Sequence, residues 1–215
     1  RHGIGCCYSS AFIHVVNADG SSVASVELPG WATFDWAPDS QRIAYASDCR
    51  EYFGICLLNA DGTNLVNIAH KPGGDTAPVW SPDGEKIAFA SSRNGDSEVF
   101  VMNADGSDQI NLTNYGSGWD DYPTWSPDGN KIAFSSYRDG NFEIYVMNVD
   151  GSNQFNLTNH PAGDTNPVWS PDGMKIAFIS DRDGNQEIYV VNADGSGLVR
   201  LTNNDANDYA PVWSP

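Results

Sequence analysis

Residues 77–114 read APVWSPDGEKIAFASSRNGDSEVFVMNADGSDQINLTN, and this stretch decides the fold because the chain repeats it. Close copies occupy residues 122–159 and 166–203, and a looser copy occupies residues 34–70. Each copy carries one tryptophan and a further one follows near the end, spaced 44, 45, 44 and 44 residues apart: Trp36, Trp80, Trp125, Trp169 and Trp213. Self-similarity at such a fixed period is typical of solenoids, propellers and other repeat architectures.

Each copy contains four short apolar stretches that are closed by turn residues, which predicts four short strands. In residues 77–114 the first two strands are joined by SPDG, the next two by RNGD, and the last two by NADG. These Gly-centred turns are typical of tight antiparallel connections. Four antiparallel strands in about 44 residues match one blade of a β-propeller. The sequence therefore predicts an all-β propeller, with five four-stranded blades.

The two ends of the chain are complementary in this pattern. Residues 4–28 resemble the second to fourth strands of a blade, and residues 209–215 resemble a first strand. We therefore expect a single domain over residues 1–215, in which the two ends share a closing blade made of residues 1–31 and 209–215. The four complete units then cover residues 32–75, 76–120, 121–164 and 165–208. The alternative is a segment of a larger ring or of a tandem array.

The consensus PxWSPDGxKIAFxSxRDGNxEIYVMNADG, followed by LTN, resembles the TolB-type bacterial β-propeller repeat, a WD-like family with a Pro-Asp motif. The resemblance covers nearly the whole chain. It implies a propeller located in the periplasm or outside the cell. It does not imply a catalytic residue, because the same repeat serves scaffolds, peptidase-associated propellers and extracellular modules.

The charge balance excludes some partners. The chain has 28 acidic and 11 basic side chains, for a formal net charge of −17, so nucleic acid is not an expected partner. No apolar run approaches the length of a membrane span, so we do not expect the chain to be embedded in a membrane. Four cysteines are candidates for one or two disulfides, or for small buried strand residues: Cys6, Cys7, Cys49 and Cys56.

A carboxylate recurs five positions before the repeated tryptophan. In a propeller this position lies where the first strand of each blade enters the central channel, so the four side chains are expected to converge. Convergent oxygen ligands suit Ca²⁺, which is the one cofactor expected here. The alternative is that each aspartate bonds to N–H groups of its own loop. The candidate metal ligands are Asp75, Asp120, Asp164 and Asp208.

The loops between blades carry aromatic and imidazole side chains on the same face as these aspartates. Exposed rings beside polar groups suit a sugar or a peptide, so these residues are the candidate ligand-binding face: Trp31, His70, Tyr115, Trp119 and His160. The five repeated tryptophans are instead expected in the core of the blades. Three cross-strand ion pairs are expected in the RNGD-type turns: Arg93 with Glu98, Arg138 with Glu143, and Arg182 with Glu187.

The chain contains no motif for nucleophilic, metal-dependent or phosphate chemistry, so no catalytic residue is predicted. The leading hypothesis is a non-catalytic, secreted or periplasmic propeller that binds a protein, peptide or glycan. Two alternatives remain: one unit of an extracellular fibre or adhesin that self-associates, and an accessory domain of a hydrolase.

Overall fold

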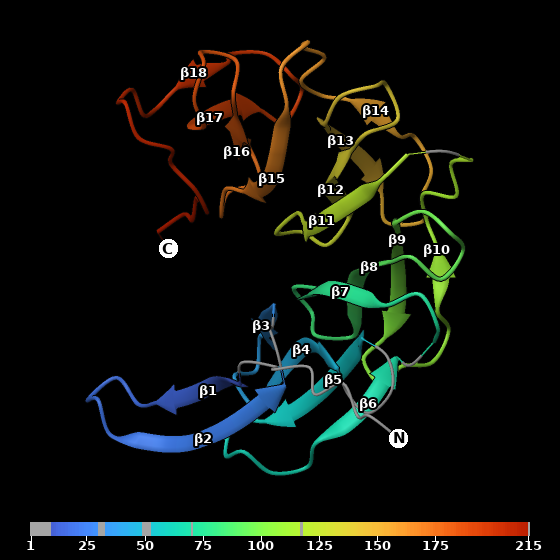
Figure 1. The fold of residues 1–215 in the computed structure, drawn as a ribbon, viewed down its shortest axis with the longest axis vertical. Helices are drawn as coiled ribbons and strands as arrows, with labels where there is room; N and C mark the ends of the chain where they lie inside the picture. The colour runs from blue at the N-terminus through green and yellow to red at the C-terminus, as the bar shows by residue number, and fades with distance from the viewer. Residues whose placement is uncertain (1–9, 30–32, 49–52, 70, 117, 215) are drawn as a thin grey trace, which may run out of the picture.

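The computed structural model describes residues 10–29, 33–48, 53–69, 71–116 and 118–214, and they form an all-β fold. Four antiparallel four-stranded sheets follow a two-stranded sheet, and within each sheet neighbouring strands are consecutive in the sequence. The two-stranded sheet contains β1 (Ser10–Val16) and β2 (Ser22–Pro29). Figure 1 shows the five sheets following one another along an arc, with the first strand of each four-stranded sheet toward its centre. The predicted β-propeller is confirmed.

The four complete blades have nearly identical strand bounds. The first contains β3 (Phe34–Trp36), β4 (Arg42–Asp48), β5 (Phe53–Asn59) and β6 (Val66–Ala69). The second contains β7 (Asp75–Trp80), β8 (Lys86–Ser91), β9 (Glu98–Asn103) and β10 (Ile110–Asn111). The third contains β11 (Asp120–Trp125), β12 (Lys131–Ser136), β13 (Glu143–Asn148) and β14 (Phe155–Asn156). The fourth contains β15 (Asp164–Trp169), β16 (Lys175–Ser180), β17 (Glu187–Asn192) and β18 (Val199–Arg200).

The turns are closed by the short polar residues of the repeat. Asp105 Oδ1 accepts hydrogen bonds from the backbone N–H and the hydroxyl of Ser107, at 2.9 and 2.6 Å. These bonds lower the pKa of Asp105, the hydroxyl bond contributing most. The next residue, Gly106, has φ +88°, and a side chain there would collide with the backbone of Ile68 in the preceding blade. The turn thus fixes both the hairpin and its approach to the neighbouring sheet.

The hydrophobic core lies between neighbouring sheets. Trp80 at the end of β7 packs with Ala37, Ala44, Ile55 and other buried residues of the preceding blade. Equivalent clusters surround the buried tryptophans of the next two blades, Trp125 and Trp169. A fourth cluster joins the β1–β2 sheet to β4 and β5.

Trp36 departs from the expected core position, because 39% of its surface is exposed. Two later tryptophans bond to the first strand of the preceding blade: the indole N–H of Trp125 donates to Val79 O at 3.2 Å, and that of Trp213 donates to Val168 O at 3.0 Å. Among the described residues, the two-stranded β1–β2 sheet offers Trp36 no such strand. The core prediction is therefore wrong for Trp36, whereas Trp213 is half-buried.

Within the described part of the chain the C-terminal segment is not paired in a sheet, but its contacts are those of a first strand. Asp208 N–H donates to Gln186 O at 2.8 Å, the Trp213 indole donates to Val168 O at 3.0 Å, and Ala210 has φ +51°. The same contacts recur in the third blade, between Asp120 and Ser97 and between Trp125 and Val79. Residues 4–8, which would pair with this segment, lie outside the described residues. The shared closing blade stays a prediction.

Of the candidate disulfide residues, Cys56 is buried in β5 and is disulfide-bonded. Cys6, Cys7 and Cys49 lie outside the described residues. No helix in the described parts of the chain is long and apolar enough to cross a bilayer.

Candidate functional site

The aspartates at the start of the inner strands are buried and paired with arginine. Arg93 Nη2 lies 2.7 Å from Asp75 Oδ1, and both side chains are almost fully buried. The same pair joins Arg138 to Asp120 at 3.0 Å. The third example joins Arg182 to Asp164 at 2.8 Å. Each arginine is 18 residues downstream of its partner, at the turn that follows the second strand of the same blade.

These arginines are held in place from several sides. Arg138 Nε donates to Ser136 Oγ at 2.7 Å, and Arg138 Nη1 donates to Gln154 Oε1 at 2.7 Å. Its guanidinium carbon lies 4.5 Å from the ring centroid of Tyr145. Each guanidinium balances the charge of the carboxylate that it meets, which gives the buried pair a structural role. The second oxygens of two of these carboxylates, Asp75 Oδ2 and Asp120 Oδ1, are buried without a hydrogen-bond partner among the described residues.

The expected convergence of four aspartates on one cation is therefore wrong. Asp75, Asp120 and Asp164 each face a guanidinium of their own blade. Asp208 is half-buried and accepts from Asn204 Nδ2 at 2.9 Å. Within the described ranges, no three His, Cys, Asp or Glu side chains are grouped so that they could hold a metal ion. The arrangement of these four residues does not fit a calcium site.

The three expected arginine–glutamate pairs are also wrong, because the arginines turn toward the aspartates. Glu98 instead accepts from Asn94 and Asn111. Glu187 accepts from Arg200 Nη2 at 2.9 Å and from the backbone N–H of Asn204 at 3.0 Å. Hydrogen bonds from Thr202, Asn204 and Arg200 lower the pKa of Glu187 to about 2. These glutamates tie the turn between the second and third strands to the loop that leaves the blade.

An exposed aromatic group lies at the same end of the β11–β14 blade, formed by Tyr115, Trp119 and Tyr137. Their surfaces are 51%, 59% and 47% exposed. Tyr137 N–H donates to Trp119 O at 2.9 Å, and the guanidinium of Arg138 lies 4.8 Å from the ring centroid of Tyr115. The ring of Phe142 packs edge-on against Tyr137, with centroids 5.1 Å apart.

Sequence reasoning found Tyr115 and Trp119 but missed Tyr137. The signal was present, because the other blades carry Ser92 and Asp181 at the position of Tyr137. They likewise carry Gly74 and Gly163 at the position of Trp119. Residues that break a repeat are not required by the blade itself, which makes them the informative ones.

The remaining candidates for the ligand-binding face do not join this group. His160 lies in the loop after β14, where its backbone N–H donates to Glu143 Oε1 at 2.8 Å and its Nδ1 accepts from Ala162 N–H at 3.1 Å. Trp31 and His70 lie outside the described residues.

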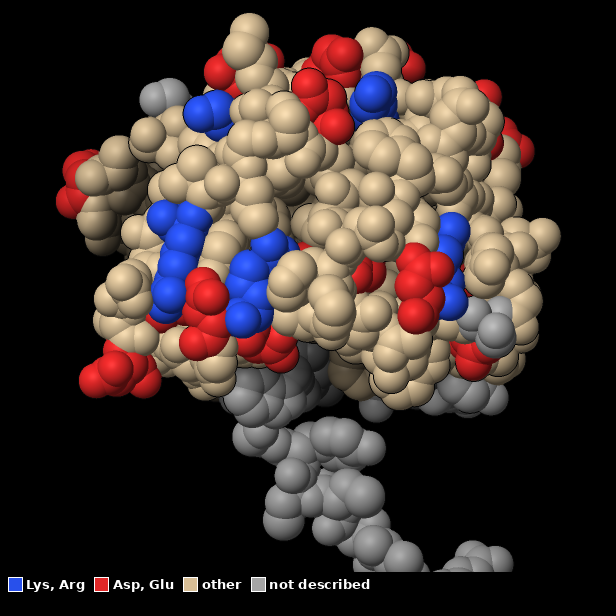
Figure 2. All heavy atoms as spheres, turned by 90° about the horizontal axis from the view of Figure 1, so that it is seen from above, with Lys and Arg blue, Asp and Glu red and all other residues tan. Residues whose placement is uncertain are grey.

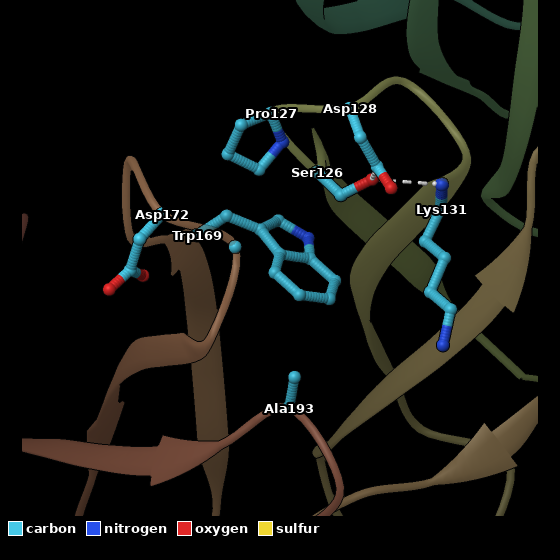
Figure 3. Close-up of a pocket in the computed structure, with 8 residues that line it drawn as sticks. Ser126, Pro127, Asp128, Lys131, Trp169, Asp172 and Ala193 are labelled. Atoms are coloured by element: carbon cyan, nitrogen blue, oxygen red, sulfur yellow. Dashed lines mark hydrogen bonds between the residues drawn. The ribbon is translucent and has the colours of Figure 1, made fainter.

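A pocket of about 420 Å³ lies at the opposite end of the blades, between the β11–β12 and β15–β16 turns. Figure 3 shows the indole of Trp169 in the middle of the lining residues, with Asp172 on one side and Lys131 on the other. The first turn contributes Ser126 and Asp128, and Ala193 lies opposite them. The lining therefore combines one aromatic face, two carboxylates and one ammonium group.

The basic side chains are dispersed. Figure 2 shows the molecule of Figure 1 from above. On this face Lys and Arg stand singly or in small groups among Asp and Glu, and they form no continuous basic area.

Comparisons with solved structures place the chain among propellers. A protein described as TolB from Agrobacterium tumefaciens superposes with a TM-score of 0.72 at 26% identity, covering 90% of this chain and 81% of that one. TolB from Acinetobacter baumannii gives a TM-score of 0.71 at 24% identity, covering 92% of this chain and 50% of that one. The chain thus spans half the length of the latter. A puromycin hydrolase gives a TM-score of 0.71 at 14% identity, covering 91% of this chain and 36% of that chain, which shows the fold alone.

None of the curated proteins matches the chain. The family model of the TolB beta propeller domain matches residues 9–122 and 114–215. The repeat, the four complete blades and this match agree, and the chain belongs to the TolB beta propeller domain family.

Proposed function

We propose that the chain is a non-catalytic propeller that binds a protein partner in the bacterial periplasm, through the aromatic group Tyr115, Trp119 and Tyr137. The observation that carries this proposal is the exposure of three large rings at one end of the β11–β14 blade. Two of them, Trp119 and Tyr137, stand at positions where the equivalent blades have Gly, Ser or Asp. Family membership and the likeness to TolB proteins support the binding role and the compartment.

The chemistry of the group suits a protein interface. Trp and Tyr are enriched among the residues that contribute most to binding, because they bury large surfaces and keep a polar handle. Trp119 and Tyr137 are joined through their backbones, so the two rings are presented from a fixed frame. Arg138 is ion-paired with Asp120, and its guanidinium lies against the ring of Tyr115. The rings therefore need little ordering when a partner binds.

The charge of the chain narrows the class of partner. A net charge of −17 repels acidic proteins and attracts basic ones at low ionic strength. We therefore expect a partner with an apolar contact surface and a neutral or basic rim.

The experiment is site-specific photo-crosslinking in the periplasm of a bacterial host. A photoreactive phenylalanine analogue replaces Trp119 in one variant and Met174 in the control, since Met174 is 68% exposed and lies in the β15–β16 turn at the opposite end of the blades. We expect a discrete adduct at position 119 that is missing at position 174, and its mass spectrum identifies the partner. Binding of the purified partner should then weaken at least roughly 10-fold in Trp119→Ser, as for a central interface residue.

Equal adducts at both positions, or unchanged affinity in Trp119→Ser, would overturn the proposal. A glycan array probed with the wild-type chain and with Trp119→Ser separates a sugar ligand from a protein ligand. Binding to a glycan that is lost in Trp119→Ser would keep the site but reject the protein partner.

A further inference from the structure

The turn between the second and third strands of the third blade holds a nitrogen donor beside a buried glutamate. Asn141 Nδ2 donates to Glu143 Oε1 at 2.8 Å, and the backbone N–H of His160 donates to the same oxygen at 2.8 Å. Asn141 Nδ2 also donates to two carbonyls of the loop that leaves the blade, His160 O at 2.8 Å and Ala162 O at 3.0 Å. The fourth blade repeats this arrangement around Asn185. The position next to the glutamate thus takes an N–H donor.

The second blade lacks both donors. Asp96 stands at the repeat position of Asn141, and a carboxylate cannot donate. Its side chain is exposed, and no hydrogen bond or ion pair joins it to another described residue. The following loop has the five residues 115–119 where the third blade has the four residues 160–163, and among the described residues no bond joins Tyr115 to Glu98.

Glu98 is therefore left with one free oxygen. Its Oε2 accepts from Asn94 Nδ2 at 3.0 Å and from Asn111 Nδ2 at 2.6 Å, whereas no described residue donates to its Oε1. Only 6% of the Glu98 surface is exposed. A carboxylate oxygen that is largely removed from water and has no donor is unfavourable, so a donor supplied from outside the chain gains an acceptor that is already in place.

The two carboxylates adjoin the aromatic group of the next blade. Ser97, which lies between Asp96 and Glu98, is bonded to Asp120, the residue that follows Trp119. Asp120 N–H donates to Ser97 O at 2.8 Å, and Ser97 Oγ donates to Asp120 O at 3.2 Å. A partner that rests on Trp119 is thus separated from the carboxylates by one bonded pair of residues.

We propose that Asp96 and Glu98 bind the ε-ammonium group of a lysine side chain that the protein partner inserts beside Trp119. The ammonium takes the place that the Asn141 amide nitrogen holds in the next blade, and a compact point charge fits that place better than a planar guanidinium. A donor nitrogen also fits better than a metal ion, because within the described ranges no third acidic or imidazole side chain joins the pair. The inference rests on the proposed function for the source of the lysine.

The test follows the Ser97 amide and the Trp119 indole signals of the ¹⁵N-labelled full chain by NMR, with the indole assigned by its loss in Trp119→Ser. Nα-acetyl-lysine amide is the probe, and its Nε-acetylated form is the matched neutral control. We expect a saturable shift with the probe and binding at least roughly 10-fold weaker with the control, as for the loss of a hydrogen bond to a charged group.

Two variants that remove the same charge separate the site from the general field of the molecule. Asp96→Asn replaces the free carboxylate by the neutral amide of the other blades, so the probe should bind at least roughly 10-fold more weakly. Asp205→Asn changes an exposed residue in the loop after β18, so binding should stay as in the wild type. Absence of a saturable shift, equal binding of the two probes, or an unchanged response in Asp96→Asn would each overturn the proposal.

Failure of the proposed function gives a different result. If a crosslinked partner loses affinity in Trp119→Ser but keeps it in Asp96→Asn, the aromatic site stands and the lysine contact is wrong. If the probe binds as expected but position 119 gives no adduct, the lysine site stands and the proposed function is wrong.

Discussion

Arg182 Nη2 donates to both carboxylate oxygens of Asp164, at 3.0 Å to Oδ1 and 2.8 Å to Oδ2, and the pair is buried where the inner strand of the fourth blade begins. Removing one partner leaves a buried charge uncompensated. We expect Asp164→Ala to lower the free energy of unfolding by about 3–5 kcal/mol. Urea denaturation followed by tryptophan fluorescence measures it.

The control for this pair is the exposed Asp96, for which Asp96→Asn should change stability by less than about 0.5 kcal/mol. The double variant Asp164→Leu with Arg182→Met should be more stable than Asp164→Ala, because no lone charge remains. A double variant as unstable as the single one would contradict this account.

Calcium should not stabilise the chain through its four repeated aspartates. The charge of three of them is already balanced by a buried arginine, so these carboxylates offer a cation little net negative charge. We expect the same melting temperature in EDTA and in millimolar Ca²⁺. A rise that depends on Ca²⁺ concentration, and that is lost in Asp208→Asn, would restore the metal-site hypothesis.

The repeated tryptophans should differ in their contribution to stability according to burial. Trp125 is 7% exposed and Trp36 is 39% exposed. Trp125→Ala should cost about 3–5 kcal/mol, as for a large side chain removed from a core. Trp36→Ala should cost about 1 kcal/mol, the typical value for a point mutation. Equal losses in chemical denaturation would mean that Trp36 is buried in solution.

The contribution of Glu187 should depend on pH in one direction. Its pKa is lowered to about 2 in the folded chain, from an ordinary value of 4.5. A lowered folded pKa means that the stabilisation is fully present above the unfolded pKa and is lost as pH falls from about 4.5 toward 2. The stability difference between the wild type and Glu187→Gln should therefore shrink over this interval in urea titrations. A difference that is constant with pH would contradict the assignment.

The closing blade predicts slow amide exchange in the C-terminal segment. If residues 209–213 pair with residues 4–8, their N–H groups should be protected from hydrogen exchange, and deletion of residues 1–9 should abolish that protection. Amides of β16 and β17 serve as the internal reference, because their pairing does not involve the N-terminus. Fast exchange at residues 209–213 in the intact chain would reject the shared blade.

The fold was predictable from sequence because every blade repeats the same turn chemistry, as in the Asp105–Ser107 turn. The roles of the charged residues were less predictable. Arg138 has Glu143 five residues away and Asp120 eighteen residues away, and only the geometry of the blade selects the distant partner. The free oxygen of Glu98 also escaped sequence reasoning, because it depends on which neighbouring groups donate to the carboxylate. The fibre and hydrolase-accessory hypotheses stay predictions.

The location of the apolar clusters between sheets has a consequence for how the molecule comes apart. Because each blade buries its apolar faces only against its immediate neighbours, its stability approximates a sum of nearest-neighbour terms, as in a linear lattice. Loss of order should then spread inward from a terminal blade. A whole unit could equally be inserted at a blade boundary, because it would bring a new interface of the same kind with it.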